Sequence, residues 1–396
     1  MNSLDRRELL SRLVALDSTS SRSNLEVVDL LSEVVDRPGV RLYRHTTPDG
    51  QKANLIAFLG PTEVSDRPAD RAGLILSGHT DVVPALEPDW DSPPFALSER
   101  GDRWYGRGTA DMKGFLALAA DLASRLDLDS LKAPLVLIFT HDEEVGTLGA
   151  QRLAHDWSDG RSPEPLPKAC VIGEPTSLRV IRFHKGHLKL RVTAKGRPAH
   201  SSLPQLGKNA IEAMGRAIVG LTALRRELEG ERSETSIYFP EAPFVPLNLG
   251  LISGGAAINI VPERSVLELG VRLLPRFEED SSEDVSRVRQ RVEEAVRATA
   301  TSEDEFVVSV LGDSPPLSCP AHSPAAAALC AELGDHGERG APFASDGGPF
   351  QALGIESVLF GPGSIEVAHR ANEFLPAVEF EVAGQVLERL VDRLCR

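Results

Sequence analysis

The sequence predicts an α/β fold in which helices cover both faces of a mostly parallel sheet, interrupted by an inserted α+β domain. Near-continuous apolar strands alternate with helical patterns up to residue 175, which is typical of a sheet buried on both faces. From about residue 182 the strands alternate apolar with polar residues, as in a sheet with one exposed face. We therefore expect one domain from residues 1–181 and 313–396, with residues 182–312 inserted.

The first domain begins with two amphipathic helices, predicted at 4–17 and 24–36 from apolar residues at helical spacing. Strands at 40–46 and 54–60 follow, joined by a Pro-Asp-Gly turn. The polar, Pro-rich segment 61–73 predicts a surface loop. Apolar strands ending near His79, Thr140 and Ile172 then alternate with helices at 114–126 and 148–157.

The inserted domain has its own order of elements, read from the same patterns. We predict strands at 187–196, 246–254, 257–262, 265–275 and 305–312, and helices at 208–228 and 281–299. The first domain then resumes with a Pro-rich crossover at 314–320, a helix at 325–333, a strand within 356–364 and a last helix at 377–394.

Composition excludes several classes of protein. Lys plus Arg total 43 against 58 Asp plus Glu, a net charge of −15, which argues against nucleic acid or an anionic membrane as partner. No run reaches the roughly 18 apolar residues of a membrane span, and the amphipathic start differs from a signal peptide. The scattered cysteines, Cys170, Cys319, Cys330 and Cys395, predict reduced thiols and a cytoplasmic protein.

Metal-ligating residue types follow the apolar strands. The run GLILSG ends in His79, with Asp81 two residues on, and other strands lead to Glu143-Glu144 and to Glu174. A lone acid after a strand more often caps a helix, but two adjacent buried carboxylates need a cation or a proton. Asp111 and His369 complete a set of oxygen and nitrogen donors without cysteine, which suits two Zn²⁺ or Co²⁺ ions.

Two other classes fit the α/β pattern less well. A dinucleotide-binding oxidoreductase would carry G-x-G-x-x-G between its first strand and helix, and that motif is absent there. A metal-free binding or scaffold protein would have no reason to keep every one of these donors.

Taken together, the motifs resemble the co-catalytic zinc deacylases and exopeptidases, which include acetylornithine deacetylase, succinyl-diaminopimelate desuccinylase, glutamate carboxypeptidase and aminoacylase. The matching motifs, in family order over nearly the whole chain, are SGHTDVVP, GRGTADMKG, HDEEVG, IGEPT, RPAHSS, INIVPE, VRLLP and GPGSIEVAH. Within the family, HTDVVP, the HKG at 184–186 and the GPGS before AH are most similar to acetylornithine deacetylase.

The resemblance implies roles for the donor residues. His79 and Glu174 would bind one metal ion, and Glu144 and His369 the other. Asp111 would bridge the two ions, and its peptide bond to Met112 would be cis. Asp81 would orient His79, and Glu143 would be the general base, which takes a proton from a metal-activated water and returns it to the leaving amine.

The resemblance also implies a substrate and a partner. His200 would reach the active site of a second subunit in a homodimer formed through residues 182–312, while Asn259 and Arg272 would bind the substrate. The implied reaction is hydrolysis of an N-acyl amino acid, first of all N-acetyl-L-ornithine in arginine biosynthesis. The alternatives are another N-acyl amino acid, such as an N-succinyl compound, or a carboxypeptidase or dipeptidase. Ser345-Asp346 stands where a Thr-Glu pair is expected, so the pocket for the amino-acid side chain could differ.

Overall fold

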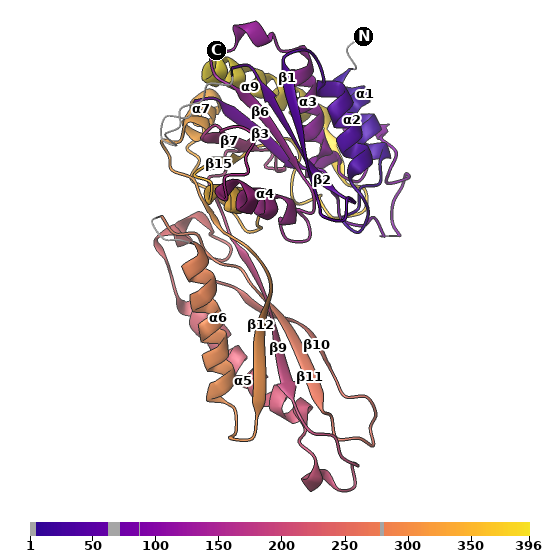
Figure 1. Ribbon diagram of the computed structural model, residues 1–396, viewed down its shortest axis with the longest axis vertical. Coiled ribbons are helices and arrows are strands. Elements are labelled where there is room, and N and C mark those ends of the chain that lie inside the picture. Colours follow the sequence, from indigo (N-terminus) through magenta and orange to yellow (C-terminus); the bar gives the residue numbers. More distant parts are fainter. Residues whose placement is uncertain (1–4, 62–71, 87, 278–280) are drawn as a thin grey trace. The chain divides into compact units, whose positions relative to one another are not determined.

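A computed structural model describes residues 5–61, 72–86, 88–277 and 281–396 (Figure 1). The chain divides into two compact units. The first unit comprises residues 1–182, 319–339 and 345–396, and the second comprises 183–318 and 340–344. The second unit is therefore an insertion, and the first unit depends on segments far apart in the sequence.

The first unit is built on a six-stranded sheet in the order β1-β2-β6-β3-β7-β15. Its strands are β1 (Val40–Thr46), β2 (Ala53–Leu59), β3 (Leu74–His79), β6 (Leu135–Thr140), β7 (Ala169–Ile172) and β15 (Glu356–Leu359). The neighbours β6, β3, β7 and β15 run parallel, and β2 is antiparallel to both β1 and β6. The mostly parallel α/β class predicted from the apolar runs is confirmed.

Helices cover both faces of this sheet (Figure 1). They are α1 (Arg6–Ala15), α2 (Leu25–Val35), α3 (Gly114–Arg125), α4 (Leu148–Ser158), α7 (Pro324–Leu333), α8 (Gly347–Gln351) and α9 (Ala377–Cys395). Because side chains alternate along a strand, Leu55, Ala57 and Leu59 of β2 join the main apolar core with α2, α3 and α9. All but the five-residue α8 follow the predicted helix positions. Residue 4 and most of the predicted loop 61–73 lie outside the described residues.

A small antiparallel sheet in the first unit was not predicted. It has the order β16-β5-β4, from Phe374–Pro376, Arg103–Tyr105 and Ser98–Arg100. Three-residue strands are too short to show a period of two. In the register of β16 and β5, Phe374 pairs with Tyr105, which brings the segment after β5 beside the segment before β16.

The second unit contains an antiparallel sheet in the order β10-β11-β9-β12. Its strands are β9 (His187–Lys195), β10 (Leu247–Gly254), β11 (Arg264–Val271) and β12 (Glu305–Ser314). The buried residues of β9 and β11 pack with α5 (Ala210–Gly230) and α6 (Ser281–Ala298) in a separate core. A second sheet joins the two-residue strands β13 (Leu317–Ser318), β8 (Phe183–His184) and β14 (Gly340–Ala341).

One predicted strand of the second unit is wrong. Residues 257–262 form a turn, in which Ile258 is fully exposed and Ile260 makes only an isolated bridge to His200. Gly255, with a φ of 75°, ends β10, and Pro262 has no N–H for a sheet ladder. The alternating apolar residues of 257–262 therefore lie in a loop that packs on the segment 199–201 through Ser201 N–H to the Asn259 carbonyl.

Among the described residues, no helix combines the length and the apolar character needed to cross a bilayer. The four cysteines are free thiols, and three of them are buried.

Candidate active site

The candidate active site lies at the carboxyl edge of the parallel strands. His79 is the last residue of β3, Glu143 and Glu144 lie in the turn after β6, and Glu174 follows β7. Because β6, β3 and β7 are parallel neighbours, their carboxyl ends meet at one edge, where α/β proteins bind ligands.

Asp111 and His369 reach this edge from irregular segments. Asp111 lies in a kinked turn, Thr109–Lys113, that leads into α3; its own backbone is not helical, and its peptide bond to Met112 is cis, as predicted. His369 lies between β15 and β16 with a φ of 61°, a left-handed conformation that non-glycine residues seldom adopt.

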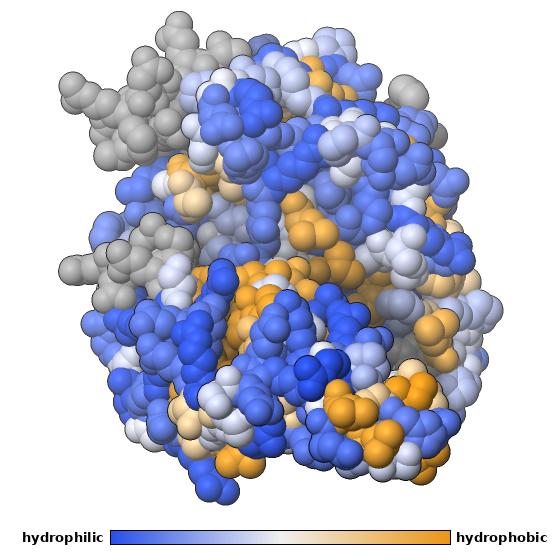
Figure 2. Space-filling model, turned by 60° about the horizontal axis from the view of Figure 1, so that its bottom comes forward, coloured by the Kyte–Doolittle hydropathy of each residue, from blue (hydrophilic) through white to orange (hydrophobic). Residues whose placement is uncertain are grey.

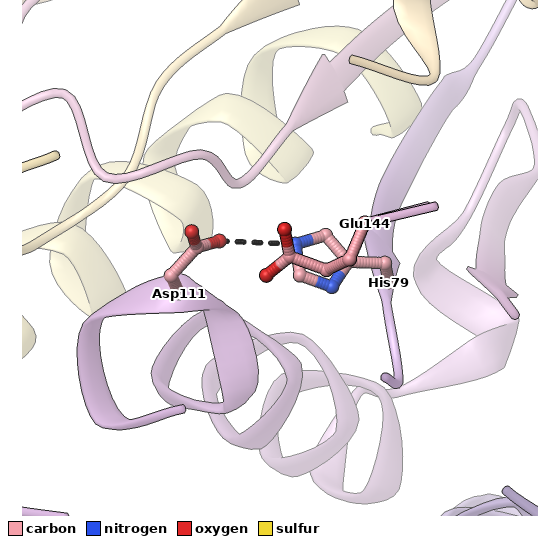
Figure 3. Close-up of side chains that lie close together, drawn as sticks. All are labelled: His79, Asp111 and Glu144. Atoms are coloured by element: carbon pink, nitrogen blue, oxygen red, sulfur yellow. Dashed lines mark hydrogen bonds and ion pairs between the residues drawn. The ribbon is translucent and has the colours of Figure 1, made fainter. Parts of the chain in front are cut away.

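The imidazoles and carboxylates meet around Asp111. His79 Nε2 lies 3.0 Å from Asp111 Oδ1, and His369 Nε2 lies 3.2 Å from Asp111 Oδ2. His369 Nε2 is also 3.1 Å from Glu144 Oε1. The donor atoms of His79, Asp111 and Glu144 all lie within 4.8 Å of one another, and Figure 3 shows the three side chains pointing toward a common point. The two oxygens of Asp111 thus face different histidines.

This arrangement fits a metal centre. His79 Nδ1 is 2.9 Å from the Asp81 carbonyl, a contact that requires a proton on Nδ1 and leaves Nε2 as a lone pair in the neutral ring. That lone pair faces a carboxylate at 3.0 Å, which is favourable only with a cation between them or a second proton on the ring. At metal–ligand bonds of about 2.1 Å, tetrahedral neighbours are about 3.4 Å apart, close to the observed donor spacing.

The electrostatics of the site also favour a bound cation. Burial raises the pKa of Glu143 and of Glu174 well above the ordinary value, and burial also raises the pKa of Glu144. Hydrogen bonding to Asp111 and Glu144 raises the pKa of His369 to about 10. Clustered buried carboxylates are stable only when protonated or when a cation balances them.

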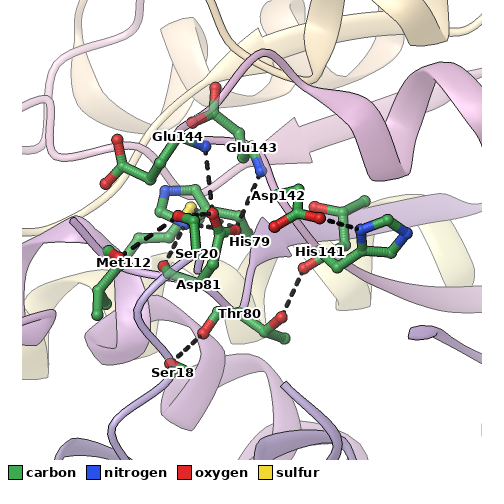
Figure 4. Close-up of polar contacts among 12 residues, drawn as sticks. Ser18, Ser20, His79, Thr80, Asp81, Met112, His141, Asp142, Glu143 and Glu144 are labelled. Carbon is green, nitrogen blue, oxygen red and sulfur yellow. Dashed lines mark hydrogen bonds and ion pairs between the residues drawn. The ribbon is translucent and has the colours of Figure 1, made fainter. Parts of the chain in front are cut away.

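Asp81 contacts the turn after β6 as well as His79. Its carbonyl accepts from the His79 ring, whereas its carboxylate Oδ1 is 3.8 Å from Nδ1. The carboxylate accepts instead from the backbone N–H of Glu143 (3.0 Å) and of Glu144 (3.3 Å), and from the Ser20 hydroxyl (2.7 Å) (Figure 4). Asp81 therefore fixes the turn that carries Glu143 and Glu144 as well as the imidazole.

Asp346, where the sequence departs from the expected pattern, is 1% exposed at the start of α8. Its Oδ2 accepts from the Thr140 hydroxyl at 2.5 Å, and burial raises its pKa to about 6. The Asp346 carboxylate therefore lies in the interior beside Thr140, the last residue of β6.

His200, Asn259 and Arg272 belong to the second unit. His200 and Asn259 lie on neighbouring exposed loops, because Ser201 N–H donates to the Asn259 carbonyl. Arg272 directly follows β11, where Val271 pairs with Leu188. Arg272 therefore lies at the end of the sheet opposite to the end that carries His200 and Asn259.

Two residues of this region were not predicted. Glu373 Oε1 accepts from the backbone N–H of Ala110 and of Asp111, and Glu373 Oε2 accepts from Arg107. Arg107 lies within the GRGTADMKG motif, but the motif gave it no role, and an acid before a short strand resembles an ordinary surface residue. Both are buried.

An α/β sheet with imidazoles and carboxylates clustered at its carboxyl edge defines a candidate metal centre. Residues 75–393 match the model of "Peptidase family M20/M25/M40", and the chain belongs to this family. It is thus a hydrolase of amide bonds.

The relatives are similar over nearly their whole length. Acetylornithine deacetylase of Edwardsiella ictaluri (strain 93-146) is 34% identical over 383 residues, covering 96% of this chain and 94% of that protein. Among solved structures, an M20 metallo-carboxypeptidase of Sulfolobus solfataricus superposes with a TM-score of 0.72 at 17% identity, covering 98% and 99% of the chains. A dinuclear metal-binding M20 peptidase of Bacillus subtilis gives 0.62 at 16% identity, covering 97% of each chain.

Proposed function

We propose that this protein hydrolyses N-acetyl-L-ornithine to L-ornithine and acetate, a step of arginine biosynthesis in the cytoplasm. The observation that carries the proposal is the pair of imidazoles, His79 and His369, on opposite oxygens of the buried Asp111. The similarity to acetylornithine deacetylase over 96% of the chain supports the choice of substrate.

The centre would hold two divalent ions, Zn²⁺ or Co²⁺. His79 and Glu174 would bind one ion, Glu144 and His369 the other, and Asp111 both. A bridging carboxylate needs each oxygen to face a different ion, and the contacts of Asp111 with two histidines supply that arrangement. A dinuclear centre is also stated for the M20 peptidase of Bacillus subtilis.

When bound, two divalent ions would supply the Lewis acidity that activates water and polarises the substrate carbonyl. Glu143 removes the proton from the attacking water at its carboxylate and delivers it to the leaving amine nitrogen. The raised pKa of Glu143 that burial causes suits a group that must hold this proton between the two steps. Asp81 keeps Glu143 in place through the backbone N–H of the turn.

The second unit supports a homodimer. The paired strands β9 and β11 extend over eight residues between the two loops and Arg272, a length of roughly 25 Å. His200 and Asn259 therefore cannot share one small substrate with Arg272 of the same chain. We infer that Arg272 binds the substrate carboxylate, by the bidentate hydrogen bonds a guanidinium offers, while His200 and Asn259 serve the site of a partner subunit.

The edge strand β10 is our candidate for the dimer contact. Leu251 is 67% exposed and Ile252 is 60% exposed on a strand with one neighbour. An apolar edge strand invites pairing with a second copy about a two-fold axis. On the face that Figure 2 views, apolar residues lie at the surface in several places among hydrophilic ones.

A second candidate function is hydrolysis of another N-acyl amino acid or of a peptide. The observation that favours it is Ser345-Asp346, since Asp346 is shorter than the expected glutamate. An M20 member of the same fold is a carboxypeptidase.

The test is metal content and then substrate preference. We expect about two Zn²⁺ or Co²⁺ per chain by elemental analysis, lost with activity on chelation and restored with it on re-addition. The metal-loaded protein should prefer N-acetylornithine over N-succinyl amino acids and dipeptides by kcat/KM. A higher kcat/KM for any of these competitors would replace the proposed substrate, and a metal-free active protein would overturn the proposal.

A further inference from the structure

A buried ion pair lies beside the ligand cluster, outside the proposed catalytic set. Arg107 and Glu373 are each 1% exposed, and Arg107 Nη1 lies 2.8 Å from Glu373 Oε2. Burying an arginine and a glutamate costs several kcal/mol per ion before their attraction offsets it. A buried ion pair of this kind is weak evidence for a contribution to stability. The other contacts of Arg107 and Glu373 indicate the role of the pair.

Glu373 holds the backbone of the bridging residue. Its Oε1 accepts from the N–H of Ala110 at 3.0 Å and of Asp111 at 3.1 Å. These bonds fix the backbone of the turn from which the Asp111 side chain points toward the two histidines. The Glu373 carbonyl also accepts from Gly106 N–H at 3.0 Å, so the two segments are joined on both sides of Arg107.

Arg107 holds the other ligand segments. Its Nη1 donates to the carbonyl of Arg370, the residue after His369, and its Nη2 donates to the carbonyl of Pro84, both at 3.3 Å. Pro84 ends the segment that begins at His79 and Asp81. One guanidinium thus contacts the loop of His369, the loop after His79, and, through Glu373, the turn of Asp111.

The unpredicted small sheet brings these groups together. Arg107 follows β5 by two residues, Glu373 precedes β16 by one, and the two strands pair. The backbone of His369 is left-handed, a conformation that few non-glycine residues adopt although histidine does so more often than most, and the contact of Arg107 with the Arg370 carbonyl holds the loop in place.

We propose that the Arg107–Glu373 pair is a positioning device that sets the separation of Asp111 and His369, and with it the affinity of the ion that these residues share. The inference rests on the proposed two-ion centre. Neither residue touches the substrate; both act through the ligands they hold. Removing a group that orients metal ligands typically weakens metal binding by about 10–100-fold.

The test measures metal binding separately from activity. The full-length protein is stripped with a chelator and titrated with Zn²⁺ against a chromophoric competitor, and with Co²⁺ by visible absorbance. In Glu373→Gln, an amide nitrogen faces either Arg107 or the two N–H groups. We expect one ion to bind about 10–100-fold more weakly, with a changed Co²⁺ spectrum, while the other ion retains more of its affinity.

The matched control is Glu164→Gln. Glu164 also forms a partly buried pair with an arginine of the same unit, with Arg41 Nε at 2.7 Å and Nη2 at 2.9 Å, but it contacts no ligand segment. Glu164→Gln should leave the affinities for both metal ions and the Co²⁺ spectrum at wild-type values. A general effect of losing an arginine–carboxylate pair would appear in both variants.

A milder variant covers the case in which Glu373→Gln fails to fold. Glu373→Asp keeps the charge beside Arg107 but withdraws the carboxylate from Ala110 and Asp111, so the same loss of affinity is expected. A folded Glu373 variant that binds both ions with wild-type affinity and spectrum would overturn the inference. A wild-type protein that binds fewer than two ions would instead overturn the proposed function.

Discussion

The carboxyl edge of the first unit and the loop end of the second unit, residues 199–209 and 255–262, differ in how their polar side chains are held. At the first, Asp81, Asp111 and Glu174 are buried, and several donors contact each other or fixed backbone groups. At the second, His200 is exposed and its ring contacts only Ser202, two residues on, among the bonds observed. The first region is preorganised within one chain, whereas in the proposed dimer the second would acquire a defined environment only from the partner subunit.

The largest effect should come from the preorganised region. Glu143→Ala should lower kcat by about 10²–10⁴-fold, because a positioned general base contributes that much. Two ions should remain bound, since Glu143 is not assigned as a ligand. Kinetics on N-acetylornithine with metal analysis of the same sample checks both points. A rate above about a tenth of wild type would remove Glu143 as the base.

The exposed loop end should matter almost as much, but across subunits. We expect His200 to donate to the tetrahedral oxyanion in the partner's site, so His200→Ala should lower kcat by about 10²–10³-fold, as loss of one oxyanion donor does. Mixing inactive His200→Ala with inactive Glu143→Ala chains should restore activity, because one site of each heterodimer regains both groups. No recovery after verified subunit exchange would place His200 in its own chain's site, or in none.

A substitution in the edge strand β10 can separate the effect of losing the dimer from the effect of losing the metal centre. Leu251→Lys places like charges near each other in a two-fold pairing, which costs about 3 kcal/mol and weakens the dimer roughly 100-fold. Activity should fall with dimer content in sedimentation equilibrium, while metal content stays constant. Val307→Lys, on the opposite edge strand β12 and 43% exposed, is the matched control and should leave the dimer intact.

The smallest effect concerns a charge held within the second unit. Arg216 donates to both oxygens of Asp304, at 2.9 and 2.7 Å, and this pairing lowers the pKa of Asp304 to about 2. The unfolded value is about 3.9, so the pair contributes on the order of 2 kcal/mol above pH 4 and loses it as the pH falls toward 2.

Asp304→Asn should remove this contribution. Protection of α6 amides against hydrogen exchange should be lower in the variant at pH 6 and converge with wild type near pH 2. Chelation of metal should change neither curve. An equal difference between the two proteins at both pH values would argue against an ionised Asp304 as the source.

Physical reasoning from the sequence could place the site residues that lie at strand ends. His79, Glu144 and Glu174 follow apolar runs, and parallel pairing brings such positions to one edge. Asp111 and His369 lie in a kinked turn and a left-handed loop, where periodicity carries no information, and neither follows a strand of the main sheet directly. Their roles, and those of His200, Asn259 and Arg272, stay predictions.

The fold was predictable from the sequence where a helix or strand is long enough to show its hydrophobic period. Helices such as α5 and α6 and the strands β3, β6 and β9 show clear patterns, while the three-residue strands β5 and β16 do not. The contact of Arg107 with Glu373 spans 266 positions and depends on those short strands. Residues 257–262 alternate like a strand, but Gly255 and Pro262 exclude them from the sheet.

The insertion of the second unit into the first has a consequence for biosynthesis. Chains fold from the N-terminus as they are made, and the segment with His79, Asp111, Glu144 and Glu174 emerges before the whole second unit. His369 and Glu373 emerge only after the second unit has been made. The nascent protein therefore carries four of the five proposed ligands while the second unit is synthesised, and the proposed second ion would gain its full set of ligands only after that unit is complete.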